Sequence, residues 1–181
     1  MPIMVTFNEM NDFLNKDLNN NRILLENAQI NLEAKNTFLS YSSKDSKYVP
    51  YVIKILESHG AKVYIDKGDD RLPNPPSVKT AAILKSSIHK CKKIVVFVTT
   101  NSKDSKWIPW ELGLGDGTKT YDNVALFPSA ENSYETTWLS QEYLGLYKRI
   151  VWGKINGYDK ELWMVYNHHD NTATPLKDWL N

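Results

Sequence analysis

The sequence predicts an α/β domain in which a central parallel sheet of about five strands carries helices on both faces. Short β-rich runs alternate with helical stretches along the chain, which is the order produced when helices connect parallel strands. One of those runs, residues 92–99 (KKIVVFVT), is largely apolar and β-branched, as expected of a strand covered on both faces. The length of 181 residues suffices for one such domain with its own core.

The individual elements are predicted from apolar periodicity and from residues that start or stop regular structure. Apolar residues recur at helical spacing from Val49 to Leu56, and Gly60 can end that helix because glycine turns left-handed without strain. Ser77 can cap a second helix that runs to about Lys90. A short helix is expected after the third strand. The strands are predicted at residues 36–42, 61–66, 92–99, 123–128 and 147–152.

Residues 1–34 are predicted to form a helical N-terminal extension to a domain of residues 35–181. Thr6 and Glu9 have the spacing of a capping box, in which each side chain accepts a hydrogen bond from the other residue's backbone N–H. Apolar side chains then recur at helical spacing. The three asparagines at 19–21 predict a break between two helices.

The segment after residue 153 is rich in aromatic residues, histidine and asparagine, and it shows no clear periodicity. Only residues 174–180 (TPLKDWL) predict an element, a short final helix. His168, His169 and Asp170 lack the helical or hairpin spacing of metal ligands. A solvent-exposed loop is therefore expected there, and no metal site.

Composition argues against several functional classes. Lys and Arg number 22 and Asp and Glu number 21, which gives a formal net charge of +1. Such a balanced charge gives no reason to expect nucleic acid or an anionic membrane as a partner. Cys91 is the only cysteine, which rules out an internal disulfide and a zinc finger. No signal peptide is visible, and the longest strongly apolar run, residues 94–98, is too short to span a bilayer. We expect a cytoplasmic protein that acts on a small ligand or a protein partner.

Three polar segments are expected to meet at one edge of the sheet. Each follows a predicted strand, and ligands of open parallel sheets collect outside the carboxyl ends of the strands. A single polar turn is more often just a capped connection, so their convergence is what indicates a site. The segments are SYSSKD (40–45), DKGDDR (66–71) and TTNSKDSKWIPWE (99–111).

Glu111 is the sharpest candidate within these segments. In a helix, Trp107 and Glu111 are neighbours on one face, and Trp110 adjoins the acid. A carboxylate partly desolvated by an aromatic wall is an unusual environment that suits binding or catalysis on a cationic or polar ligand. The other interpretation is that both tryptophans anchor a short helix in the core while Glu111 points to water. The pattern alone leaves both open.

The glycines that follow, GLGDG at 113–117, superficially resemble a dinucleotide-binding pattern. That pattern requires a preceding strand and a following helix, whereas this one follows a helical stretch. We expect the glycines to end the helix early. The G-x-S-x-G motif of a serine nucleophile is absent from the sequence.

Residues 36–128 resemble a TIR domain in the order and separation of three pieces. These are TFLSYSSKD at the first strand, KVYIDKGDD running into the loop after the second, and IVVFVTTNSKDSKWIPWELG from the third strand into the next helix. The resemblance implies a flavodoxin-like fold. The later stretch EYLGLYKRIVW (142–152) is similar to the TIR subunits of Thoeris anti-phage systems.

The resemblance implies an activity and a catalytic residue. Some TIR domains are adaptors that assemble through homotypic contacts, and others cleave NAD at the nicotinamide–ribose bond. In the enzymes one Glu in a Trp-x-x-x-Glu setting carries the activity, and Trp107 and Glu111 match that setting. The residues that the resemblance assigns to substrate binding are Tyr41, Ser42, Ser43, Asp66, Lys67, Arg71 and Trp107.

The Thoeris resemblance further implies a cyclic ADP-ribose isomer as product, which acts as a second messenger on a separate effector protein. NAD is then a substrate, no cofactor is expected, and self-association through TIR surfaces is expected. Two alternatives stay open at this point. One is an adaptor in which Glu111 is only structural, and the other is an enzyme similar to nucleoside deoxyribosyltransferases that uses Glu111 as nucleophile.

Overall fold

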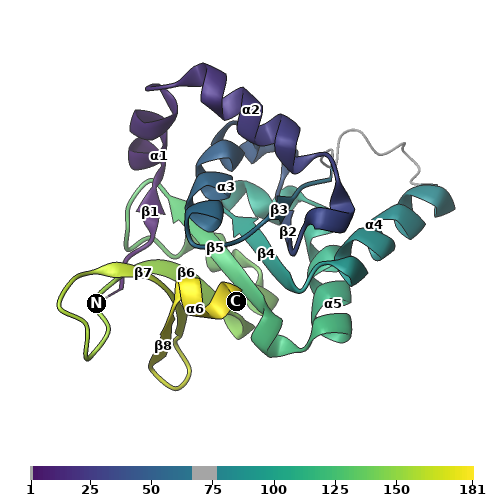
Figure 1. The fold of residues 1–181 in the computed structure, drawn as a ribbon. Coiled ribbons are helices and arrows are strands. Elements are labelled where there is room, and N and C mark those ends of the chain that lie inside the picture. Colours follow the sequence, from purple (N-terminus) through teal and green to yellow (C-terminus); the bar gives the residue numbers. More distant parts are fainter. Residues whose placement is uncertain (1, 67–76) are drawn as a thin grey trace.

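The predicted parallel strands form the centre of the sheet. The computed structural model describes residues 2–66 and 77–181, and within them the chain forms an eight-stranded sheet with the order β3-β2-β4-β5-β6-β7-β8 and β1 beside β5 (Figure 1). The strands β2 to β6 pair in parallel, as predicted. Their bounds are β2 (Thr37–Ser40), β3 (Val63–Tyr64), β4 (Lys93–Val98), β5 (Val124–Ala130) and β6 (Lys148–Gly153).

Three strands extend the sheet beyond this parallel centre. β7 (Leu162–Asn167) and β8 (Thr172–Pro175) add an antiparallel hairpin beside β6, where the sequence showed no clear element. The strand β1 (Val5–Thr6) pairs in parallel with the end of β5. A two-residue strand carries no periodicity of its own, so only its partner in space defines it.

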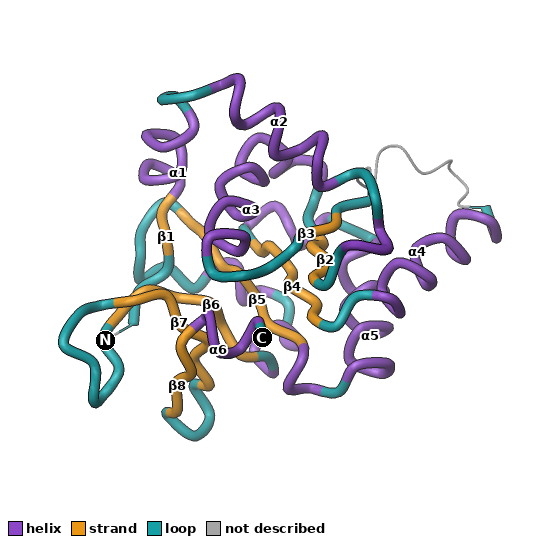
Figure 2. The backbone as a smooth tube through the Cα atoms, in the orientation of Figure 1, coloured by secondary structure: helices purple, strands orange, loops and turns teal. Residues whose placement is uncertain are grey.

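Helices cover both faces of the sheet, as predicted (Figure 2). Alternate residues of β4 divide between the layers: Ile94 and Val96 pack with the helices α4 (Val78–Lys90) and α5 (Trp107–Lys119), and Phe97 packs with α3 (Val49–Ser58). All six residues of β4 are buried, which explains its unbroken apolar run. Ser77 caps α4 as predicted. No helix among the described residues is both long and apolar enough to cross a membrane.

The N-terminal helices pack on the same face of the sheet as α3. The capping box of Thr6 and Glu9 is confirmed at the start of α1 (Phe7–Leu14). The predicted break at residues 19–21 is wrong, because α2 (Leu18–Ala28) runs through them. Asp17 caps α2 by accepting a hydrogen bond from the Asn20 N–H at 2.9 Å, so the break lies before the asparagines. The division into an extension of residues 1–34 and a domain of residues 35–181 stays a prediction.

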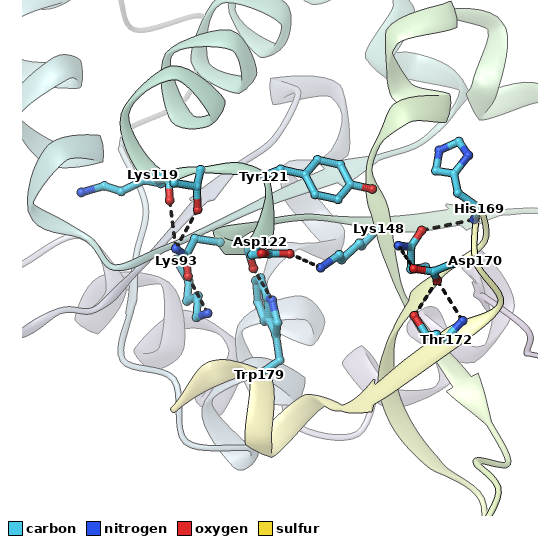
Figure 3. Close-up of polar contacts among 12 residues, drawn as sticks. Lys93, Lys119, Tyr121, Asp122, Lys148, His169, Asp170, Thr172 and Trp179 are labelled. Carbon is cyan, nitrogen blue, oxygen red and sulfur yellow. Dashed lines mark hydrogen bonds and ion pairs between the residues drawn. The ribbon is translucent and has the colours of Figure 1, made fainter.

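The C-terminal helix is anchored at the amino-terminal edge of the parallel strands. This is α6 (Leu176–Leu180), which confirms the predicted final helix. The Trp179 indole N–H donates to the Asp122 carbonyl at 2.8 Å, and the Lys93 ammonium lies 4.6 Å from the centre of the Trp179 ring. Lys93 also donates to Asn123, and Lys148 pairs with Asp122 (Figure 3). This polar cluster holds the chain end and lies at the edge opposite the predicted site.

The expectation that the glycines of residues 113–117 end α5 is wrong. The helix continues through them to Lys119, and Thr120 follows with a φ of 75°. A Cβ atom built on Gly115 would lie 3.2 Å from Cγ1 of Ile94 in β4, which is tighter than ordinary van der Waals contact. Glycine at this position lets the helix approach the strand, and that packing offsets the low helix propensity of glycine.

Two substitutions in α5 should therefore have opposite effects on the free energy of unfolding. We expect Gly115→Val to lower it by about 2 kcal/mol, since the added methyl groups collide with Ile94. Gly113→Ala serves as the matched control, because a Cβ there meets nothing within 4 Å, and it should raise stability by roughly 0.5–1 kcal/mol. Urea unfolding followed by circular dichroism measures both. Equal stabilities for the two variants would contradict the close packing.

Candidate functional site

Glu111 is buried at the carboxyl edge of the parallel strands. Only 5% of the residue is exposed, and its Oε2 atom accepts a hydrogen bond from the Ser40 hydroxyl. Ser40 is the last residue of β2, and Glu111 lies in the second turn of α5, so the contact joins a strand end to a helix far along the chain. Of the two interpretations that the sequence left open, the one in which Glu111 points to water does not describe this structure.

Two tryptophans stand at the start of the helix that carries this acid. Trp107 is the first residue of α5, and its ring meets that of Trp110 edge to face, with centroids 5.5 Å apart. Trp107 is half-buried and packs against the core on the α4 and α5 face, whereas Trp110 is 37% exposed. The pair therefore combines the two roles weighed from the sequence, a core anchor and an aromatic surface close to the acid in sequence.

The loop after β2 distributes its side chains unevenly. Ser42 is buried, and its carbonyl accepts the backbone N–H of Asp45 at 2.8 Å. Ser43 begins a 3-10 helix, η2 (Ser43–Tyr48). Tyr41 is half-buried and packs against the core cluster on the α3 face, which is the face opposite that of α5. The structure thus brings the Ser40 hydroxyl to the Glu111 carboxylate. Ser40 was not singled out from the sequence.

Asp45 joins this loop to the loop after β4. Its residue exposure is 0%, and its carboxylate accepts hydrogen bonds from the Thr99 hydroxyl at 2.7 Å and the Asn101 side-chain amide at 2.8 Å. Burial raises the pKa of Asp45, while the hydrogen bonds from Asn101 and Thr99 oppose that rise. Two of the three segments expected to converge are therefore linked directly through a buried acid.

Sequence reasoning missed Asp45 because an acid after a strand and small polar residues looks like an ordinary cap. Its burial depends on donors more than fifty positions away, which no local pattern shows. The available signal was the shared polar character of the two loops at one predicted edge.

The loop after β4 is itself well ordered by hydrogen bonds before α5 begins. Thr99 and Ser102 form a capping box at the 3-10 helix η4 (Thr100–Asp104). At the surface, the Lys44 ammonium pairs with the Asp104 carboxylate at 2.7 Å, and that hydrogen bond lowers the pKa of Asp104. Exposed ion pairs add little stability. The buried Asp45 contacts, rather than this pair, are therefore expected to fix the two loops relative to each other.

The remaining predicted site residues follow β3. Asp66 is half-buried just beyond that strand, next to Ile65, whose backbone N–H donates to the Ala28 carbonyl at 3.0 Å. Lys67 and Arg71 lie outside the described residues. The site residues that the structure describes therefore come mainly from the ends of β2 and β4 and the start of α5.

The other candidates from the sequence lie elsewhere. His168, His169 and Asp170 occupy the turn between β7 and β8, and His168 Nε2 lies 2.8 Å from the Gly145 carbonyl. Across residues 2–66 and 77–181, no group of three or more His, Cys, Asp or Glu side chains is arranged to hold a metal ion. Cys91 is buried, and burial raises the pKa of its thiol to about 11, so the thiol is suited to core packing rather than nucleophilic attack.

A family profile described as TIR domain matches residues 37–152, which contain Ser40, Asp45, Trp107 and Glu111. A protein of Bacillus cereus (strain MSX-D12), whose name describes it as the 3′ cyclic ADP-D-ribose synthase ThsB′, is 35% identical to this chain over 163 residues. The match covers 87% of this chain and 82% of that protein. A protein of Cytobacillus dafuensis, whose name describes it as the cyclic ADP-D-ribose synthase TIR2, is 34% identical to this chain over 94 residues. The match covers 50% of this chain and 24% of that protein. Each of these two names marks the synthase activity as inferred for that protein.

Proposed function

The chain belongs to the TIR domain family, and we propose that it cleaves NAD at the nicotinamide–ribose bond and closes the remaining ADP-ribose into a cyclic isomer. The observation that carries this proposal is the buried Glu111 carboxylate, held by Ser40 at the carboxyl edge of the sheet. A surface used only for adaptor contacts gives no physical reason to bury an acid there. The names of the two relatives, both given for cyclic ADP-D-ribose synthesis, support the same activity.

The chemistry needs one carboxylate rather than the pair that a glycosidase uses. Nicotinamide leaves as a neutral base, because the electron pair of the breaking C1′–N bond neutralises its positive ring nitrogen. No acid is required to protonate it. The ribose is left with an oxocarbenium-like centre, as in glycoside hydrolysis. A hydroxyl oxygen of the same ADP-ribose then bonds to C1′ and releases its proton to solvent, which completes the cyclic product.

Glu111 is proposed to act on the ribose while this charge develops. Its carboxylate oxygens accept hydrogen bonds from ribose hydroxyls and stabilise the positive centre electrostatically. Ser40, which donates to Oε2, holds the carboxylate in one orientation. That hydrogen bond is formed before substrate arrives, so little reorganisation accompanies the reaction.

The neighbouring residues are proposed to bind the rest of NAD and to exclude water. Trp107 offers an aromatic surface to the nicotinamide ring. Ser42 and Ser43 offer polar groups where some TIR enzymes carry basic residues, and Tyr41 packs against the core cluster on the α3 face. Asp66, Lys67 and Arg71 belong to the segment that closes over the site or meets another protomer in the family. Exclusion of water favours capture by an internal hydroxyl over hydrolysis.

The wider role proposed here follows from the Thoeris resemblance. The cyclic product acts as a diffusible second messenger in anti-phage defence and activates a separate effector protein in the cytoplasm. The name of ThsB′ supports the 3′ isomer as the product. The proposal includes self-association through TIR surfaces. It includes neither nucleic acid nor a membrane as a partner. NAD is the substrate, and no further cofactor is proposed.

Mass spectrometry of nicotinamide and ADP-ribose species tests the activity. Extracts of cells that express the full chain, with and without phage infection, are incubated with NAD. We expect equal molar amounts of nicotinamide and a cyclic product that co-elutes with a 3′ cyclic ADP-ribose standard. Linear ADP-ribose alone would contradict the cyclisation step. NAD left intact under both conditions would favour the adaptor, and nucleobase release from deoxynucleosides instead would favour the deoxyribosyltransferase alternative.

A further inference from the structure

A second candidate binding site lies beyond the Glu111 site and centres on Arg149. This residue is the second of β6, and it pairs with Leu126, so its side chain lies on the α4 and α5 face of the sheet. In the part of the chain that the structure describes, Arg149 forms no ion pair, and its Nε atom is buried without a hydrogen-bond partner. A buried N–H donor without an acceptor is energetically unfavourable, so an acceptor for Nε is expected from elsewhere.

One face of the guanidinium is already covered. The Cζ atom of Arg149 lies 5.1 Å from the centre of the Trp138 ring, a cation–π contact. The Trp138 ring is fixed in turn, because its indole N–H donates to the Glu135 carbonyl at 3.0 Å and only 3% of the residue is exposed. That face of the guanidinium is therefore occupied, and the N–H donors, which lie in the plane of the group, remain available to a ligand. Burial also lowers the pKa of Arg149.

Arg149 lines a cavity of about 160 Å³. Much of its wall is apolar and is formed by Met4, Pro128, Trp138 and Val151. This volume is close to that of cavities of about 150 Å³ that admit a single benzene ring. A small molecule with an apolar body therefore fits this cavity.

The polar residues that line the cavity favour a carboxylate over a phosphate as the bound anion. The planar fork of arginine matches a carboxylate through two parallel N–H···O hydrogen bonds. Glu135 also lines the cavity, and its carboxylate accepts from the Thr137 hydroxyl. A doubly charged phosphate next to this acid would be repelled more strongly than a singly charged carboxylate. Tyr166, which pairs with Arg149 across β6 and β7, adds another polar side chain to the wall.

We propose that this cavity binds a small monocarboxylate with an apolar body, with the carboxylate on Arg149 and the body between Met4, Pro128 and Val151. The site is independent of NAD cleavage, since none of the residues proposed to act on NAD lines it. Its occupant fills the cavity and accepts a hydrogen bond from Arg149 Nε, which has no partner among the described residues.

Benzoate and benzamide test the proposal on the wild-type chain, because the two molecules share a ring and differ in the charged group. Isothermal titration calorimetry is expected to show saturable benzoate binding at least about tenfold tighter than benzamide binding. Arg149→Gln should abolish that preference and leave benzoate no tighter than benzamide. Arg22→Gln is the matched control at an exposed arginine and should leave benzoate binding unchanged. Circular dichroism establishes that each variant is folded.

Three results would overturn the proposal. One is equal affinity of the wild-type chain for benzoate and benzamide, and another is the absence of saturable benzoate binding. The third is binding of inorganic phosphate that excludes benzoate, which would assign the cavity to a different anion. If Arg149→Gln does not fold, the wild-type comparison of benzoate with benzamide still decides. Nicotinamide release from NAD, measured on the same samples, separates failure of this site from failure of the proposed enzyme.

Discussion

Glu111→Gln is expected to reduce nicotinamide release from NAD by at least about a hundredfold. Glutamine keeps the shape of the side chain, and its carbonyl oxygen can still accept the Ser40 hydrogen bond. It lacks the negative charge that the oxocarbenium-like centre requires. The loss should fall on the rate of the chemical step more than on NAD binding, because the charge develops only in the transition state.

Ser40→Ala is the informative companion to this variant. It leaves the charge of Glu111 in place and removes only the donor to Oε2. We expect a decrease of roughly tenfold in nicotinamide release, an effect of orientation rather than charge. Mass spectrometry of nicotinamide from matched extracts measures both variants, and circular dichroism checks that they fold. Undiminished release by Glu111→Gln would remove Glu111 from the proposed mechanism and leave the acid a structural role.

Asp45→Ala is expected to lower the free energy of unfolding by about 2–3 kcal/mol. The substitution leaves the Thr99 hydroxyl and the Asn101 amide without their buried acceptor, and it opens a small cavity between the two loops. Urea unfolding measures the change. Asp104→Ala removes an exposed carboxylate from the neighbouring loop and is the control, which should leave the free energy of unfolding almost unchanged. Equal losses in the two variants would show that burial of Asp45 is not what stabilises the site edge.

The pH dependence of this stability follows from the raised pKa of Asp45. In the folded chain the Asp45 carboxyl holds its proton to a higher pH than in the unfolded chain, where its pKa has the ordinary value of 3.8. The part of the stability that arises from this pKa difference is therefore fully present below pH 3.8 and is lost as pH rises through the folded pKa. Asp45→Asn does not titrate, so wild-type stability should decline relative to this variant across that window. Urea unfolding at several pH values measures the difference, and a relative increase with pH would contradict the assignment.

Much of the architecture was determined by patterns local to the sequence. The unbroken apolar run of β4 identified a strand covered on both faces, and Ser77 and the Thr6–Glu9 pair identified helix starts, because caps satisfy N–H groups within one turn. The same patterns placed Glu111 on a helix after that strand, where parallel sheets collect their ligands. Periodicity and capping are short-range properties, so the sequence alone carries them.

Other features were decided only by tertiary packing. The glycines of α5 looked like a helix end, yet Gly115 lies against Ile94, and close contact with a strand outweighs helix propensity. β1 exists because the end of β5 is beside it. At the site, Ser40 and Asp45 found partners far along the chain, and neither contact leaves a periodic trace. The sequence thus determined which residues could meet at the carboxyl edge of the sheet. Only the folded structure decided which polar atoms pair there, because burial and hydrogen bonding between distant segments depend on the arrangement of the whole chain.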